Sequence, residues 1–230
     1  MSTAAHLLAA GSSINIDFGN SLNKPSTSIL VVLGITLLAV APSLLILLTG
    51  FTRIVIVLGL VRNALGLQTI PPNQVIAGLA LFLSLFLMAP TLNQINHDAL
   101  QPYLHGQLDA THAYRAAEGP LKTWMLKQTG SDELAMTTGI DHEHPAQPTD
   151  VSMAALVPAF LLSQLKSAFI IGFVVFVPFL IVDLVVSATL MSMGVVMLPP
   201  TLVSLPFKLL LFVMVNGWML VSHSLVVSFK

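Results

Sequence analysis

The sequence contains apolar stretches that are long enough to cross a lipid bilayer. The first runs from Ile29 to Thr49 without a charged residue. At about 1.5 Å of helical rise per residue, it spans a hydrocarbon core of about 30 Å. Further apolar stretches cover residues 75–90, 167–191 and 209–229. The simplest interpretation is four membrane spans in two pairs, and the expected fold class is an all-α, polytopic membrane protein.

The composition also argues against a water-facing globular domain. Of the 230 residues, 55% are hydrophobic and only 8% are charged, whereas soluble globular domains are roughly 25% charged. The net charge of −1 and the absence of a Lys/Arg cluster argue against nucleic acid as a partner. The chain has no cysteine, which excludes disulfides and thiolate nucleophiles.

The few charges are unevenly distributed along the chain. Residues 92–152 hold eight acids and three bases, and the rest of the chain holds two acids and six bases. Such a charged segment must be solvated. The predicted organisation is an N-terminal polar segment, a first hydrophobic helical hairpin, a polar, acidic helical domain and a second hydrophobic helical hairpin, over residues 1–27, 28–91, 92–152 and 153–230.

The positive charges predict the orientation in the membrane. We expect Arg53, Arg62 and Lys208 to lie in the loops inside the two pairs, so the positive-inside rule places those turns in the cytoplasm and the acidic domain in the periplasm. Both termini then face outward, which calls for a cleaved signal peptide. Residues 1–10 lack the basic start of such a signal. Either the signal has been removed or this topology is wrong.

The two predicted hairpin turns share one spacing of glycine and proline. A glycine in a left-handed cap ends a helix, and paired prolines prevent the same helix from continuing. An internal repeat is one explanation, and the common use of these residues in turns is an equally good one. The turn residues are Gly66, Pro71 and Pro72 in the first hairpin, and Gly194, Pro199 and Pro200 in the second.

Prolines also interrupt the apolar stretches, where each removes a backbone hydrogen bond. We expect the helices to be bent or broken at these positions, which makes the hairpins proline-broken. Freed carbonyls in lipid are tolerated best when neighbouring protein covers them. This favours a multi-subunit assembly, with ordinary kinks in a monomeric bundle as the alternative. The prolines are Pro42, Pro90, Pro158, Pro178 and Pro206.

Three charges lie next to apolar sequence and need partners, because burying an unpaired charge costs several kcal/mol. They are Arg53, Lys166 and Asp183. If one helix holds both, Lys166 and Asp183 are about 25 Å apart along it, so they cannot pair within a subunit unless that helix folds back. We expect pairing between subunits, or of Asp183 with Lys208 or Arg53.

The acidic domain shows helical signals of its own. Pro120 after Gly119 predicts a helix start, with Leu121, Trp124 and Met125 on one face. Gly130 then breaks the helix, and Ser131 followed by two acids predicts a second one. Residues 137–149 read as a polar loop.

Catalytic motifs are not found in the sequence. The histidines of residues 141–145 alternate in a proline-flanked loop, which does not match the His spacing of a helical zinc site. Phosphate-binding loops, nucleophile elbows and intramembrane His and Asp pairs are missing as well. We expect a structural protein without enzymatic activity, cofactor or metal.

Several motifs in order resemble the FliP family of type III secretion export-gate subunits, over about residues 29–229. Arg53 in the first motif is similar to the flagellar branch of that family, whereas the injectisome branch often has lysine there. The motifs are Phe51-Thr52-Arg53-Ile54, Arg62-Asn63-Ala64-Leu65-Gly66, Pro71-Pro72-Asn73-Gln74, Ser163-Gln164-Leu165-Lys166, Pro178 to Asp183, and Leu205-Pro206-Phe207-Lys208.

The resemblance implies a pore-forming structural subunit of the flagellar export gate, which passes unfolded flagellar proteins across the inner membrane. Family members assemble in several copies with FliQ and FliR, next to FlhB and FlhA, in the basal body. The resemblance also implies that Val195, Val196 and Met197 seal the closed pore. The family often has methionines there and aspartate at Asn216, so this chain departs at both places.

Two other functions remain open from the sequence. An injectisome export-gate homologue shares most of the motifs. A secondary transporter for a small solute would also use repeated hairpins, broken helices and intramembrane charges. An intramembrane enzyme ranks third, because it needs a catalytic pair that the spans do not contain.

Overall fold

The computed structural model describes residues 27–140, 147–195 and 197–229, and every regular element within them is a helix. The predicted all-α fold is therefore confirmed for this part of the chain. The question of a signal peptide falls outside the described residues. The elements are α1 (Thr27–Leu48), α2 (Phe51–Ala64), α3 (Asn73–Ile95), the π-helix η1 (Asn96–Leu100), α4 (Gln101–Leu104), α5 (Ala110–Lys127), α6 (Ser131–Ile140), the 3-10 helix η2 (Pro148–Asp150), α7 (Met153–Ser192), α8 (Pro200–Met214) and α9 (Gly217–Val227).

The chain divides into two units, one up to Ser43 and one from Leu44 onward. The described part of the first unit is most of α1, a helix without any charged residue. Val32, Leu38 and Val40 are exposed on it, and their spacing places them on different sides of the helix. A helix that is apolar all round is typical of a membrane span or of a position inside a larger assembly.

The core of the second unit lies between α2 and α7. On α2, Ile54, Val57, Leu58 and Val61 are fully buried, and their spacing is that of one helical face. Small residues on α7 let the two backbones approach closely, as is common in membrane helices. A Cβ on Gly172 of α7 would lie 2.2 Å from the Leu60 side chain of α2.

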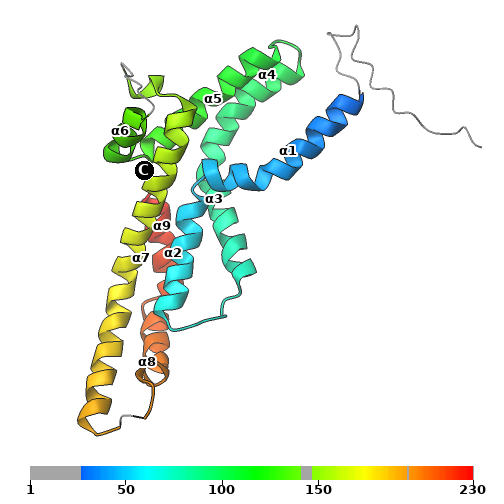
Figure 1. The fold of residues 1–230 in the computed structure, drawn as a ribbon. Helices are drawn as coiled ribbons and strands as arrows, with labels where there is room; N and C mark the ends of the chain where they lie inside the picture. The colour runs from blue at the N-terminus through cyan, green and yellow to red at the C-terminus, as the bar shows by residue number, and fades with distance from the viewer. Residues whose placement is uncertain (1–26, 141–146, 196, 230) are drawn as a thin grey trace, which may run out of the picture. The chain divides into compact units, whose positions relative to one another are not determined.

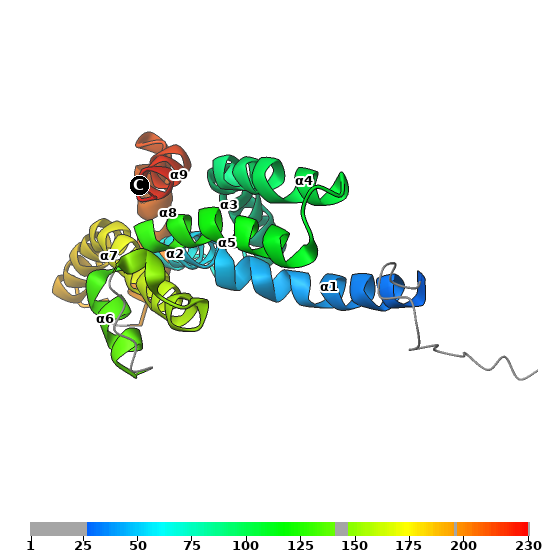
Figure 2. The ribbon, with the colours of Figure 1, turned by 90° about the horizontal axis from the view of Figure 1, so that it is seen from above.

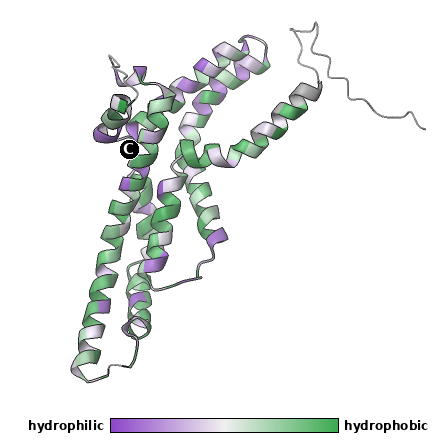
Figure 3. Ribbon diagram, viewed as in Figure 1, coloured by the Kyte–Doolittle hydropathy of each residue, from purple (hydrophilic) through white to green (hydrophobic). Residues whose placement is uncertain are grey.

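The second unit separates apolar from polar helices. The turn between α2 and α3 and the turn between α7 and α8 point toward the same end of this unit, and helices α4 to α6 lie at the other end (Figure 1). Green, hydrophobic ribbon covers α2, α7 and α8, while purple concentrates on α5 and α6 (Figure 3). In the view from above, α4 and α6 lie at opposite ends of α5 (Figure 2).

A second, smaller core joins the polar helices to the start of α7. Met125 of α5 is fully buried against Leu156 and Phe160 of α7. The ring of Trp124 lies 5.4 Å from that of Phe160. The predicted apolar face of α5 is therefore confirmed, and it fixes the polar helices on the long apolar helix.

The lengths of the helices agree with a membrane protein. Within the described residues, two helical stretches are long and apolar enough to cross a bilayer, Asn73–Leu104 and Met153–Ser192. Two broken pairs can add one span each, Leu38–Leu48 with Phe51–Ala64, and Pro200–Met214 with Gly217–Val227. The predicted count of four spans is reached when each broken pair counts as one.

The helices were predicted to be bent or broken at five prolines, and none of these prolines ends a helix. Pro42, Pro90, Pro158, Pro178 and Pro206 all lie inside continuous helices. A proline removes one hydrogen bond, but its φ angle is compatible with a helix, and the flanking turns continue across it. The only break inside the predicted fourth span is at Asn216, which adopts a left-handed conformation with φ 51°.

Other sequence-based boundaries also need correction. Arg53 and Arg62 lie on α2 and Lys208 lies on α8, so none of them is in a loop. Pro120 lies inside α5, which begins at Ala110 with Asp109 as its N-cap. The side chain of Asp109 accepts the backbone N–H of His112 at 2.8 Å. The predicted polar loop at 137–149 starts too early, because α6 continues to Ile140.

Candidate functional site

Both hairpin turns begin with the same backbone motif. Gly66 and Gly194 have φ angles of 77° and 74°, in the left-handed region that favours glycine. The N–H of Leu67 donates to the carbonyl of Arg62 at 3.2 Å, and the N–H of Val195 donates to the carbonyl of Leu190 at 3.0 Å. These bonds define a Schellman motif at the end of α2 and of α7. The predicted glycine caps are therefore confirmed.

The prolines of the two turns start the returning helices. Pro72 is the N-cap of α3, and Pro199 is the N-cap of α8, with Pro200 at the first helical position. The two turns thus share the glycine cap, but the helix start is shifted by one residue and only the first turn has a cis peptide bond among the described residues, before Pro71. The resemblance between the hairpins extends to the backbone at the glycine cap.

The tip of the second hairpin presents apolar side chains outward. Met197 is 97% exposed, and Met191, Met193 and Leu198 are exposed around it. Val195 is half-buried, and Val196 lies outside the described residues. An unbranched methionine adapts its shape to what it contacts, whereas valine is restricted at χ1.

Arg62 fixes the first turn. Its Nη1 atom donates to the carbonyl of Pro71 at 3.2 Å and to Oδ1 of Asn73 at 2.6 Å. One guanidinium therefore connects the end of α2 with the start of α3. Its contacts explain why a charged residue occurs at this place in an apolar hairpin.

A buried ion pair connects the two helices of the second hairpin. Lys208 Nζ of α8 lies 2.5 Å from Oδ2 of Asp183 on α7. The Ser204 hydroxyl donates to the other carboxylate oxygen, Oδ1, at 2.5 Å. The side chain of Lys208 is only 5% exposed and that of Asp183 is 30% exposed. Of the partners expected for Asp183, Lys208 is the one that the structure supplies.

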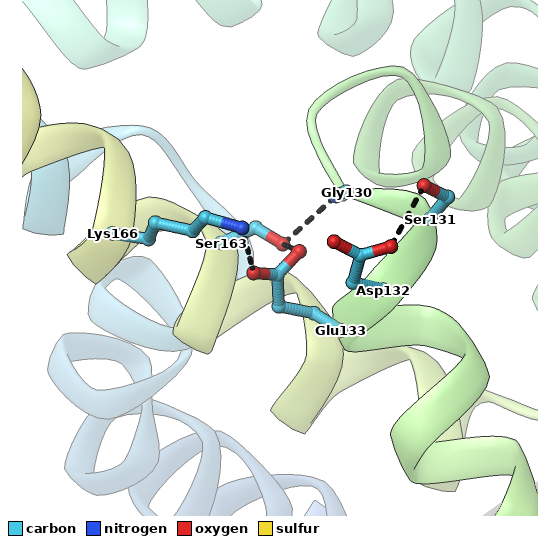
Figure 4. A network of polar contacts seen from close by, with 6 residues as sticks. All are labelled: Gly130, Ser131, Asp132, Glu133, Ser163 and Lys166. Atoms are coloured by element: carbon cyan, nitrogen blue, oxygen red, sulfur yellow. Dashed lines mark hydrogen bonds and ion pairs between the residues drawn. The ribbon is translucent and has the colours of Figure 1, made fainter.

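A second polar network fixes α6 on α7 (Figure 4). Lys166 Nζ donates to Oε1 of Glu133 at 2.8 Å, and the Ser163 hydroxyl lies 3.4 Å from Oε2 of the same residue. The Ser163 hydroxyl also accepts the backbone N–H of Gly130 at 2.9 Å. The hydrogen bond from Lys166 lowers the pKa of the Glu133 carboxyl below its ordinary value. Lys166 thus has a partner within its own chain.

Arg53 is buried at the start of α2 and contacts the end of the chain. Its Nη1 atom donates to the carbonyl of Ser228 at 2.9 Å and to the Ser228 hydroxyl at 3.2 Å. The guanidinium lies over the ring of Phe229, 4.1 Å from the centroid. Among the described residues, no carboxylate pairs with this cation.

Ser228 and Phe229 at Arg53, Ser204 at Asp183 and Glu133 at Lys166 were not predicted from the sequence as partners of these charges. Ser204 and Glu133 become important only when α8 packs on α7 and α6 packs on α7. A weak signal exists for Glu133, because it is an acid in the first turn of the predicted second helix. For Ser204 the signal is its position four residues before Lys208, which places both on one helical face.

The chemistry of these sites is structural. They contain charge pairs, hydroxyls and exposed apolar side chains at a hairpin tip. Within the described residues, no group of three or more His, Cys, Asp or Glu side chains has the arrangement of a metal site. The acidic His-containing loop of residues 141–145 lies outside the described residues, so its metal-binding capacity is not addressed by the structure.

Comparison with known proteins gives a consistent result. A family model described as the FliP family matches residues 34–225. The chain is 48% identical to the flagellar biosynthetic protein FliP of Bacillus subtilis, over 94% of this chain and 98% of the relative. It is 45% identical to the proteins of that name from Caulobacter vibrioides, over 96% of this chain and 84% of the relative, and from Aquifex aeolicus, over 88% and 86%.

Proposed function

The chain belongs to the FliP family, and from that premise we propose that it is a pore-forming structural subunit of the flagellar type III protein export gate. In this role it passes unfolded flagellar proteins across the bacterial inner membrane. The relatives reported above are all named as flagellar proteins, which supports the flagellar branch over an injectisome homologue. The chain is a component of flagellar biosynthesis with membrane-spanning character.

The observation that carries this proposal is the tip of the second hairpin. The 40-residue helix α7 and its partner α8 hold a loop with exposed methionine at one end of the unit. The Asp183–Lys208 pair fixes the two helices against each other three helical turns before that loop. In an assembly of several copies, the Val195, Val196 and Met197 loops form a ring of apolar side chains that closes the pore between substrates.

The partners follow from the same premise. Several copies of this chain assemble with FliQ and FliR, and FlhB and FlhA act next to this complex in the basal body. The exposed apolar faces of α3, α7 and α8 support burial against lipid and neighbouring subunits. We place helices α4 to α6 in the periplasm and the two turns in the cytoplasm. The chain is not an enzyme on this proposal, and energy for transport comes from other components.

A crosslinking experiment tests the position of the pore loop. Because the chain contains no cysteine, Met197→Cys introduces a unique thiol. An export substrate with a single cysteine is stalled in the gate by a tightly folded fusion domain. We expect a disulfide between Met197→Cys and the substrate.

The matched control is Met219→Cys on α9, an exposed methionine outside the loop. It should give no disulfide with the stalled substrate. Equal crosslinking at both positions, or none at Met197→Cys while the substrate is stalled, would show that this loop does not surround the substrate.

A further inference from the structure

Arg53 has the properties of a cation whose intended partner is missing from the isolated subunit. The residue is 3% exposed, and its acceptors are the neutral carbonyl and hydroxyl of Ser228. The Nε atom is buried without a hydrogen-bond partner among the described residues. Buried charges are normally paired with an opposite charge. Lys208 and Lys166 each have a carboxylate, whereas Arg62, like Arg53, has only neutral acceptors among the described residues. Arg53 differs from Arg62 in being almost fully buried.

The ring of Phe229 contacts the Arg53 guanidinium. Phe229 lies over the guanidinium and against Gly50, where a Cβ would come within 2.6 Å of the ring. Phe229 also lines an open groove of about 700 Å³ between α3 and α5, together with Trp124 and Lys127. Arg53 does not line this groove, and Phe229 contacts both the guanidinium and the groove.

We propose that a neighbouring copy of this chain inserts an acidic segment into this groove and supplies a carboxylate to Arg53. This inference rests on the proposed assembly of several copies. The carboxylate takes the Nε and Nη donors in place of Ser228, and Lys127 at the groove provides a second positive charge for the incoming segment. Charge-assisted, bidentate bonds of this kind are stronger than the neutral bonds that they replace.

The chain itself can supply the acid. Residues 92–152 carry eight acids and three bases, so this segment of a neighbouring copy has an excess of carboxylates, although Glu133 is already paired with Lys166. An anionic lipid headgroup is a weaker candidate, because Asp98 also lines the groove and repels a diffuse negative surface. A second copy of the chain holds its carboxylates at fixed positions, so it can place one near Arg53 and keep the others away from Asp98.

A carboxylate placed beside Arg53 within the same chain would compete with the carboxylate of a neighbouring copy, which gives a direct test. Ser228→Asp places a carboxylate next to Arg53 within the same chain, and Ser224→Asp places the same charge one helical turn earlier, on an exposed residue. Native mass spectrometry of the chain expressed alone measures the oligomer fraction. We expect Ser228→Asp and Arg53→Met to lower the association constant about tenfold or more, and Ser224→Asp to stay close to the original chain.

Three outcomes separate this inference from the proposed function. Oligomers of normal size with both Ser228→Asp and Arg53→Met overturn the Arg53 contact but leave the gate assembly intact. A chain that forms no oligomer in any variant contradicts the proposed function itself. If the monomer of Arg53→Met melts at a lower temperature than the original monomer, this variant is misfolded. The oligomer fraction of Ser228→Asp then decides whether the Arg53 contact exists, because this variant keeps the cation and adds a partner.

A photo-crosslinker identifies the source of the acid. A benzoylphenylalanine at position 229 keeps an aromatic ring at the groove. We expect crosslinked dimers of this chain, with the crosslink mapped by peptide mass spectrometry to residues 92–152 of the second copy. Crosslinks only to lipid, only to other gate proteins or only within one chain would overturn the second-copy proposal.

Discussion

Lys208 Nζ lies 2.5 Å from Oδ2 of Asp183, although 25 residues separate the two in the sequence. The pair joins α7 to α8 in an otherwise apolar hairpin, and Ser204 occupies the remaining carboxylate oxygen. Because lipid and apolar side chains cannot solvate either charge, each member needs the other. The hairpin geometry before the Val195 to Met197 loop therefore depends on this contact.

Breaking the pair should destabilise the hairpin. Lys208→Met leaves the Asp183 carboxylate without its cation, and we expect a loss of about 3 kcal/mol in the free energy of unfolding. Denaturant unfolding of the detergent-solubilised chain measures it. The double variant Asp183→Leu with Lys208→Met removes both charges and should recover much of the loss. The pairing would be contradicted if the double variant lost as much free energy of unfolding as Lys208→Met and Asp183→Leu lose separately, added together.

The glycine caps should be sensitive to a side chain. Gly194→Ala forces a Cβ into a left-handed conformation, which costs about 1 kcal/mol. Gly59→Ala is the matched control, because Gly59 lies inside α2 and its Cβ would meet nothing within 4 Å. Thermal unfolding should show a lower melting temperature for Gly194→Ala only. Equal effects of the two variants would argue against the Schellman motif.

The contact between α6 and α7 should depend on pH. The pKa of Glu133 lies below its ordinary value of 4.5 in the folded chain, first because of the hydrogen bond from Lys166. A lowered folded-state pKa stabilises the chain above the ordinary value, and this stabilisation is lost as the pH falls through the lowered pKa. Glu133→Gln lacks this stabilisation at every pH, because its side chain does not ionise.

The difference in melting temperature between the original chain and Glu133→Gln reports this contribution. It should be present above the ordinary value of 4.5 and should be lost as the pH falls through the lowered pKa of Glu133. Because the Lys166 side chain is 56% exposed to solvent, we expect the difference to be small and to shrink further in high salt. A difference that grows on acidification would contradict the sign of the pKa shift.

The bend between α8 and α9 should tolerate no side chain at Gly217. A Cβ there would lie 2.2 Å from the Phe212 ring, which packs edge-on against Trp218 at 5.3 Å. We expect Gly217→Ala to cost about 1–3 kcal/mol, as overpacking generally does. Tryptophan fluorescence during unfolding measures it. Gly139→Ala on α6, with free space around its Cβ, should be close to neutral.

Local chemistry explains what could be predicted from the sequence. The uncharged stretch from Ile29 to Thr49 is apolar whatever it packs against, and a glycine followed by two prolines reverses the chain through its own backbone preferences. The cap at Ser131 likewise depends only on neighbouring residues. These features do not require knowledge of distant contacts.

Tertiary contacts explain what could not be predicted. Charge suggested a loop at Arg53, but the carbonyl of Ser228 and the ring of Phe229 hold it on a helix across 175 residues. The partner of Lys166 is Glu133 because α6 packs on α7, 33 residues away. The helix break at Asn216 has no proline, and asparagine only weakly signals a left-handed conformation.

Co-expression of this chain with FliQ and FliR, detergent extraction and native mass spectrometry of the purified material test the central claim most directly. The proposed function predicts a single complex that contains several copies of this chain together with both partners. A stable monomer or dimer that binds neither partner would contradict the export-gate role and would favour a small-solute transporter.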